Sequence, residues 1–170
     1  MHHDIAIREV ELADVETVAA HRAAMFLDMG RATTEIMEQL RAESCEYLRE
    51  AIPRVEYLRW LACPQGEPGR FVAGAGVQVR RVLPFPFRRS DGSTHVAWGS
   101  QAVVINVYTD PVYRRRGYAR RLMDEVLAWA SAVELESLVL HAAPDGRALY
   151  EQLGFAPTTE MRFKGVLSGR

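Results

Sequence analysis

One segment, residues 101–123, constrains the fold of this chain more than any other; it reads QAVVINVYTDPVYRRRGYARRLM. Residues 102–105 form an unbroken apolar run with β-branched side chains, which is typical of a strand covered on both faces. Pro111 ends that strand. Apolar residues from Ala119 onward then recur at the period of an amphipathic helix. A strand, a short turn and a helix therefore organise the predicted fold.

The turn between that strand and that helix contains Arg114, Arg115, Arg116 and Gly117. The first backbone N–H groups of a helix have no internal partner, and the positive end of the helix dipole lies beside them. Glycine lets a ligand approach the backbone closely, and arginine side chains add cationic donors. The turn therefore predicts an anion-binding site. The alternative is a solvated cationic face that only precedes a helix.

Composition limits the classes of protein. The chain has 170 residues, 48% of them apolar, which suits one domain over residues 1–170. A formal charge of −1 with interspersed acids and bases predicts no nucleic-acid partner. No apolar stretch approaches the ~18 residues that span a bilayer, so we expect no membrane partner and a cytoplasmic protein. Cys45 and Cys63 have no metal-ligand spacing, so no metal site is expected.

The other predicted elements follow from periodicity and from Gly and Pro positions. In order they are a strand at 4–10, helices at 15–29 and 34–52, strands at 55–62 and 70–83, a loop at 84–93, the central strand at 98–109, a helix ending near 131, a strand at 136–141, a short helix at 147–153 and a last strand at 158–164. Gly74 and Gly76 indicate a bulge. The central strand, its helix and the next strand predict a right-handed crossover between parallel strands.

Two motifs in this order of elements resemble those of the GNAT superfamily of N-acetyltransferases. Residues 114–119, RRRGYA, fit the family's pyrophosphate-loop pattern [Gln/Arg]-x-x-Gly-x-[Gly/Ala], and residues 148–155, ALYEQLGF, resemble its C-terminal signature. The resemblance implies an α+β fold, a mixed α/β three-layer sandwich. It further implies a central sheet of about six to seven strands, about four helices, and parallel strands that splay apart at the cofactor site.

The resemblance also implies acetyl-CoA as the cosubstrate. The pyrophosphate would then be held by Arg114, Arg115, Arg116, Gly117, Tyr118 and Ala119. The end of the central strand, at Val107, Tyr108 and Thr109, would pair with the pantetheine arm and offer an amide to the thioester carbonyl, which gains negative charge during acyl transfer. For Val107, core packing is an alternative that is compatible with this role.

Tyr150 matches the tyrosine that, in many family members, donates a proton or a hydrogen bond to the departing thiolate. A phenol of pKa about 10 suits that role, although an aromatic core residue would look the same. Many members carry Asn seven residues earlier, where this chain has Ala143; another group such as Asp145 would replace that contact.

The general base has no family motif. His141, at the end of the strand after the central helix, is the candidate for deprotonating the amine. The alternative is a histidine whose ring only satisfies polar groups at the end of the sheet. Asn106 could orient a water or substrate, or only satisfy groups at the sheet end. His21 and Arg22, with Met25 and Phe26, could line the acceptor pocket, or could belong to an ordinary amphipathic helix.

The resulting hypothesis is an acetyl-CoA-dependent N-acetyltransferase that acts on a primary amine of a small molecule or peptide by direct transfer in a ternary complex. No cysteine lies in the motifs to suggest an acyl-enzyme. The alternative is a non-catalytic acyl-CoA-binding sensor or assembly module. The sequence leaves open whether the acyl group is acetyl or another. A homodimer is expected from the resemblance alone. The determinants of the acceptor are placed in the first two helices and the 84–93 loop.

Overall fold

The computed structural model describes residues 5–88 and 91–161, and the elements below belong to those ranges. Its strands are β1 (Ile5–Glu9), β2 (Tyr57–Pro64), β3 (Ala73–Arg81), β4 (Phe85–Arg88), β5 (Thr94–Ala97), β6 (Ser100–Thr109) and β7 (Ser137–Leu140). Its helices are α1 (Val15–Asp28), α2 (Met37–Ala51), α3 (Tyr118–Ala132) and α4 (Arg147–Gln152). Short 3-10 turns precede each helix, at Leu12–Asp14, Thr34–Ile36, Pro111–Tyr113 and Pro144–Gly146.

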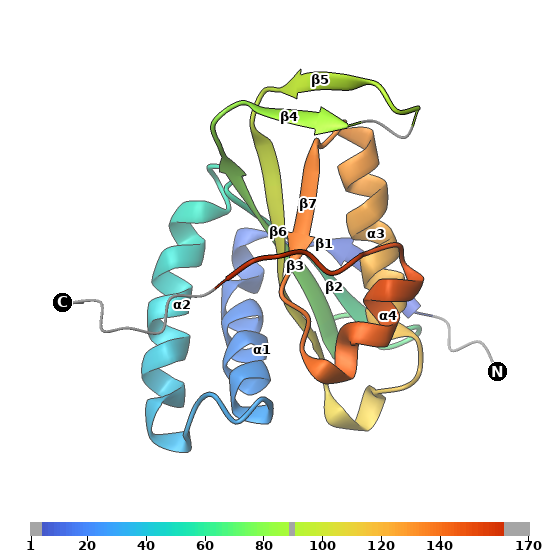
Figure 1. Ribbon diagram of the computed structural model, residues 1–170. Helices are drawn as coiled ribbons and strands as arrows, with labels where there is room; N and C mark the ends of the chain where they lie inside the picture. The colour runs from blue at the N-terminus through green and yellow to red at the C-terminus, as the bar shows by residue number, and fades with distance from the viewer. Residues whose placement is uncertain (1–4, 89–90, 162–170) are drawn as a thin grey trace.

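Five strands form the central sheet, in the order β1-β2-β3-β6-β7 (Figure 1). Neighbouring strands are antiparallel except β6 and β7, which are parallel. Because parallel strands cannot be joined by a tight turn, the connection between them runs through α3. The predicted strand–helix–strand crossover is therefore present.

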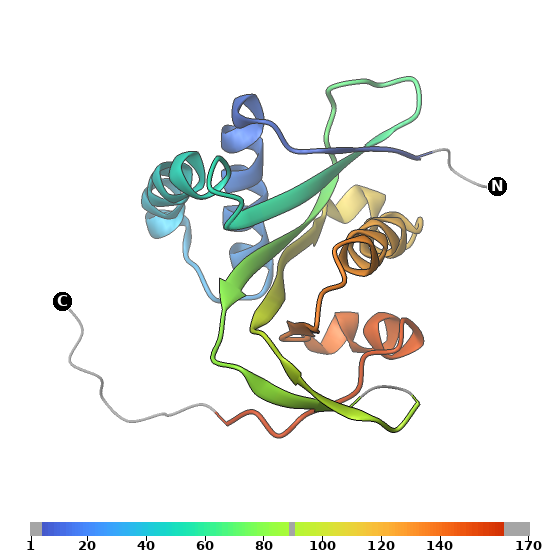
Figure 2. The ribbon, with the colours of Figure 1, turned by 90° about the horizontal axis from the view of Figure 1, so that it is seen from above.

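Helices cover both faces of this sheet and complete three layers. The views in Figures 1 and 2 place α1 and α2 on one face and α3 on the other. On the α3 side, Leu122, Met123 and Val126 are fully buried against apolar residues of β2, β3 and β6. Full burial of such a side chain contributes about 1.5–3 kcal/mol. The predicted three-layer α+β architecture is confirmed. Among the described residues the central sheet has five strands, where about six to seven were expected, because β4 and β5 pair separately.

The sheet opens between β6 and β7. Their pairing runs only from Gln101 opposite Ser137 to Val104 opposite Leu140. Residues 105–109 of β6 continue beyond the end of that pairing and bond only to β3 on their other side. The second half of β6 therefore has an open edge facing the space beyond β7, as expected for splayed parallel strands.

A β-bulge interrupts β6 where this open edge begins. Gly76 is opposite Ile105 and Gly74 is opposite Tyr108, so Asn106 and Val107 together face one residue of β3. Asn106 has a φ of 55°, a left-handed conformation that is uncommon outside glycine. A bulge of this kind bends the strand and redirects its side chains. The irregularity predicted at Gly74 and Gly76 is found, with the extra residue on the opposite strand.

The two glycines also make room for large side chains. A Cβ at Gly74 would collide with the Arg59 guanidinium, and a Cβ at Gly76 would collide with the Tyr57 hydroxyl. Both side chains come from β2 and lie across β3. Neither glycine has a positive φ, so the backbone conformation does not require glycine at these positions. The close packing of Arg59 and Tyr57 does.

Two predicted segments differ from the structure. The 84–93 segment, predicted as a loop, contributes β4, which pairs with β5 in a separate two-stranded hairpin. Alternating Phe and Pro residues obscured this strand. The hairpin base is held by Glu136, whose carboxylate accepts hydrogen bonds from the Trp98 and Gly99 N–H groups at 2.9 and 3.0 Å. Of the last predicted strand, residues 158–161 are irregular and 162–164 lie outside the described residues.

Within the described ranges, no helix is both long enough and apolar enough to cross a membrane.

Candidate active site

The N-terminus of α3 presents free backbone donors next to the open edge of β6. Gly117 precedes the helix with a φ of 89°, and nothing would lie within 4 Å of a Cβ added there. Helix geometry leaves the N–H groups of Tyr118, Ala119 and Arg120 without carbonyl partners inside the helix. The α3 dipole adds a partial positive charge at the same place. The turn therefore has the donors that an anion site requires.

The three arginines of this turn have different contacts. Arg114 donates to the carbonyl of Thr109 at 3.1 Å and forms an ion pair with Asp28 at the end of α1. Arg116 lies over the ring of Tyr113, 5.2 Å from its centroid, and remains exposed. Arg115 is exposed in a left-handed conformation, and its side chain has no partner among the described residues. Arg115 and Arg116 are therefore free to bind an anion, whereas Arg114 ties the turn to β6 and α1.

The end of β6 contributes Val107, Tyr108 and Thr109, all partly buried. Val107 packs against the core on the α3 side. Tyr108 points to the other face, where its ring centroid lies 5.1 Å from that of His21. Burial, with a smaller contribution from Asp28 and Asp110, raises the pKa of Tyr108. The side chains are thus fixed on both faces, and the backbone edge remains open between them.

Tyr150 lies on α4 and packs against the same core as Val107. Its ring meets Phe155 edge-to-face at 6.1 Å between centroids. A Cβ at Gly146 would contact the ring at 2.9 Å, so the absence of a side chain there lets the turn approach it. Burial raises the pKa of Tyr150 above its usual 10, which keeps the hydroxyl protonated near neutral pH.

His141 follows directly after β7 and is exposed. Its Nε2 lies 3.6 Å from a carboxylate oxygen of Glu160. Within the described part of the chain, it has no hydrogen bond or ion pair with Tyr150 or Asn106. The structure therefore places the predicted base at the strand end, but pairs it with an acid that the sequence did not associate with it.

A buried chain of polar side chains lies behind the bulge, on the side of α1 and α2. The Tyr57 hydroxyl accepts hydrogen bonds from Asn106 Nδ2 at 3.1 Å and from Arg59 Nη1 at 3.3 Å. Arg22 Nη1 donates to Asn106 Oδ1 at 2.5 Å. Asn106 therefore bridges α1 and β2, and its amide is fixed by partners at both ends.

His21 completes this chain in its neutral form. Burial, followed by repulsion from Arg59, lowers its pKa to about 4. Its Nε2–H donates to the Phe71 carbonyl at 3.2 Å, and its Nδ1 accepts from Arg59 Nη2 at 3.1 Å. One neutral tautomer satisfies both contacts. His21 thus holds Arg59 in place and carries no charge near neutral pH.

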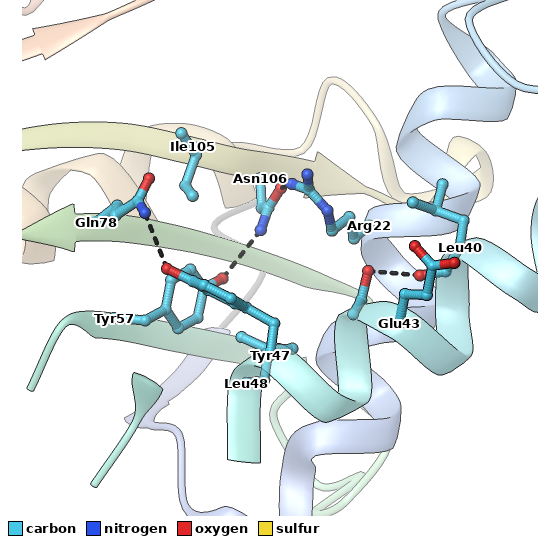
Figure 3. A pocket seen from close by; sticks show the side chains of 10 residues that line it. Arg22, Leu40, Glu43, Tyr47, Leu48, Tyr57, Gln78, Ile105 and Asn106 are labelled. Atoms are coloured by element: carbon cyan, nitrogen blue, oxygen red, sulfur yellow. Dashed lines mark hydrogen bonds between the residues drawn. The ribbon is translucent and has the colours of Figure 1, made fainter. Parts of the chain in front are cut away.

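A pocket of about 290 Å³ opens between this polar chain and α2 (Figure 3). It is lined by Arg22 from α1, by Tyr57 and Gln78 from β2 and β3, by Ile105 and Asn106 from β6, and by Leu40, Glu43, Ser44, Tyr47 and Leu48 from α2. Its floor is the bulge. The pocket and the open edge of β6 therefore meet at Asn106.

Sequence reasoning raised Arg22 and Asn106 as options and placed acceptor determinants in the second helix, but it missed Tyr57 and Arg59. The available signal was the pair of glycines in β3, whose spacing of two matches that of Tyr57 and Arg59 in β2. Among the described residues, no group of three or more His, Cys, Asp or Glu could hold a metal ion.

Comparisons with known proteins agree with this geometry. The sequence profile of the acetyltransferase (GNAT) family matches residues 31–155. A GCN5-related N-acetyltransferase from Ralstonia eutropha JMP134 is 28% identical, with a TM-score of 0.82 over 98% of this chain and 100% of that one. No curated protein matches the sequence significantly.

Two further solved structures share the fold at lower identity. A predicted acetyltransferase from Clostridium acetobutylicum, solved with acetyl-CoA, is 20% identical, with a TM-score of 0.75 over 95% of this chain and 96% of that one. Glucosamine-6-phosphate N-acetyltransferase from Arabidopsis thaliana is 11% identical, with a TM-score of 0.64 over 95% and 98%.

The family profile and the fold together identify an acetyltransferase. The chain belongs to the GNAT family, whose profile covers most of its length.

The pocket chemistry predicts that two Tyr→Phe substitutions differ in cost. Tyr57→Phe leaves the Asn106 and Arg59 donors buried without an acceptor, and we expect it to lower the free energy of unfolding by about 1–3 kcal/mol. Tyr47→Phe is the matched control, because that side chain is 47% exposed and its partner Gln78 can bond to water; we expect a loss below about 0.5 kcal/mol. Urea denaturation measures both, and equal losses would contradict the buried chain.

Proposed function

We propose that this chain is an acetyl-CoA-dependent N-acetyltransferase that acetylates a primary amine by direct attack in a ternary complex. One observation carries the proposal: the open edge of β6 begins at the bulge, where it meets the polar pocket, and continues into the turn that ends at the free amides of α3. A thioester carrier bound along this edge and an amine bound in the pocket would meet at Asn106 and Val107.

The residues present fit the pyrophosphate of coenzyme A. Gly117 leaves the approach to the α3 amides unobstructed, and the cationic side chains of Arg115 and Arg116 are not engaged by any described carboxylate. Tyr118 is buried and anchors the helix start, while Ala119 offers little bulk beside the turn. We assign binding of this group to residues 115–119, with Arg114 fixing the turn through Asp28.

The edge of β6 fits an extended arm that binds as an additional strand. Backbone groups of Val107, Tyr108 and Thr109 on that edge have no partner strand in β7. An N–H group held there donates to a carbonyl as it gains negative charge, and the fixed backbone needs no rearrangement to do so. We assign positioning and carbonyl polarisation to these residues. Acetyl-CoA supplies the activated acetyl group when bound.

Tyr150 and His141 are proposed for proton transfer. The raised pKa of Tyr150 keeps its hydroxyl protonated, so it can donate to the departing sulfur. His141 lies at the end of β7 with Glu160 beside it, and we propose that it accepts the amine proton through water.

The anion assignment predicts weaker binding in two variants. Arg115→Gln and Arg116→Gln should each raise the Kd for coenzyme A about 3- to 10-fold, because each removes one charge-assisted donor from the turn. Arg54→Gln is the matched control, since its partner is Glu50 on the exposed surface. Titration calorimetry at fixed ionic strength measures all three. An unchanged Kd in both loop variants would contradict the assignment.

The proposed reaction predicts amine-dependent release of free thiol from acetyl-CoA. Tyr150→Phe should lower kcat about 10- to 100-fold with little change in the Kd for acetyl-CoA, because the ring and its packing remain. Since the pKa of Tyr150 is raised, its deprotonation should not lower wild-type kcat below about pH 10. A thiol assay with an amine panel, followed over pH, measures this.

Full turnover in Tyr150→Phe would remove the acid role and leave the enzyme assignment intact. Tight acetyl-CoA binding without thiol release for any amine would instead favour a non-catalytic binding module.

A further inference from the structure

We infer that the acceptor is a small amine with an anionic group beside the amine, as in a free α-amino acid, and that Arg22 binds this group. This inference rests on the proposed N-acetyltransferase function and names its substrate class. It follows from the charges in the pocket, from the position of Arg22 at the bulge and from the pocket's size.

Arg22 is a cation without a counter-charge. Its guanidinium donates to Asn106 Oδ1 and lies 4.8 Å above the centre of the Phe26 ring. Among the described residues, no carboxylate lies within ion-pair distance of it. Burial lowers the pKa of Arg22, Tyr57 partly opposes this effect, and Arg59 reinforces it. A partly desolvated guanidinium with unused donors attracts a carboxylate or phosphate-like group.

Arg59 adds a second buried positive charge behind Tyr57, outside the lining of the pocket. It is 2% exposed and bonds to the neutral groups of Tyr57 and His21. Among the described residues, its Nε has no hydrogen-bond partner. Uncompensated buried charge is costly, so the combined field of Arg22 and Arg59 favours an anion in the pocket and opposes a second cation. Polyamines and aminoglycosides are therefore poor candidates for the acceptor.

Glu43 limits how many anionic groups fit. It lines the pocket on the α2 side (Figure 3). Its carboxylate accepts a hydrogen bond from Gln39 at 2.8 Å. It is not paired with Arg22. A second carboxylate on the acceptor would face this charge, whereas Leu40, Leu48 and Ile105 offer apolar contacts. An amino acid with one carboxylate and an apolar side chain fits this lining best.

The position of Arg22 sets the spacing between amine and anion. Arg22 bonds directly to Asn106, and Asn106 lies at the bulge where the proposed acetyl transfer occurs. An anion held by Arg22 therefore lies within a few bonds of the reacting amine. The volume of about 290 Å³ is near the lower limit of small-molecule pockets, which suits a single amino acid.

The test compares acceptors that differ only in the anionic group. Leucine, its phosphonate analogue, leucinamide and 3-methylbutylamine share one side chain, and spermidine represents polycations. We expect wild-type kcat/KM to be at least about 10-fold higher for leucine or its phosphonate than for leucinamide. The amine of leucinamide is the weaker base and is more fully deprotonated, so amine protonation cannot produce this preference. Whichever anion reacts better identifies carboxylate or phosphonate as the natural group.

Arg22→Gln should lower kcat/KM for the anionic acceptors about 10- to 100-fold and change that for leucinamide less than about 3-fold. Arg22→Lys keeps the charge and should retain part of the preference. Arg54→Gln, on the exposed surface, is the control for removing one arginine. Thermal unfolding of each variant checks that the fold is intact.

Binding gives a readout that does not depend on turnover. Leucine should bind to the wild-type protein saturated with coenzyme A, and Arg22→Gln should abolish this binding. The inference would be overturned if leucinamide or spermidine reacted at least as fast as leucine, or if leucine did not bind. The acetyltransferase proposal would stand in either case. If the wild-type protein did not bind acetyl-CoA, the proposed function itself would be overturned.

Discussion

The structure depends on the place where β6 stops pairing with β7. Four residue pairs join the two strands, and a bulge at Asn106 and Val107 then bends β6. A strand edge without a partner is normally a liability, because its donors and acceptors can pair with another chain. Here the open edge leads from the pocket to the N-terminus of α3, so it suits an extended ligand. The same bulge turns Ile105 and Asn106 toward α1 and α2 together, which a regular strand cannot do.

The energetic support for this bulge comes from the face opposite α3. Gly74 and Gly76 let Arg59 and Tyr57 lie against β3, and the Tyr57 hydroxyl accepts hydrogen bonds from both the Asn106 amide and Arg59. As a result, Arg22 and Arg59 lie near the pocket, and neither has a carboxylate partner among the described residues. Buried cations reduce stability unless hydrogen bonds or a ligand compensate them. The cost is consistent with a site whose counter-charge arrives with the substrate.

The sequence was sufficient to predict the crossover of β6, α3 and β7, because an apolar run and a helical period are local signals. The arginines, the glycine and the helix start are adjacent in the sequence, so the turn at Gly117 was also predictable; its role as an anion site stays a prediction. It could not predict the pocket, because a bulge changes which side chains share a face and because Tyr57 and Arg59 of β2 meet His21 of α1 only through the packing of that helix on the sheet. The strand at 85–88 was missed for a related reason: it pairs with β5 outside the central sheet.

The most direct test of this account is a titration of the ¹⁵N-labelled protein with acetyl-CoA, followed by amide chemical shifts. The account predicts that the largest changes fall on the amides of Val107–Thr109 and Arg115–Arg120, with small changes on the exposed face of α2. It would be contradicted if saturating acetyl-CoA left both groups of amides unshifted, or if the largest changes lay on a different face of the sheet.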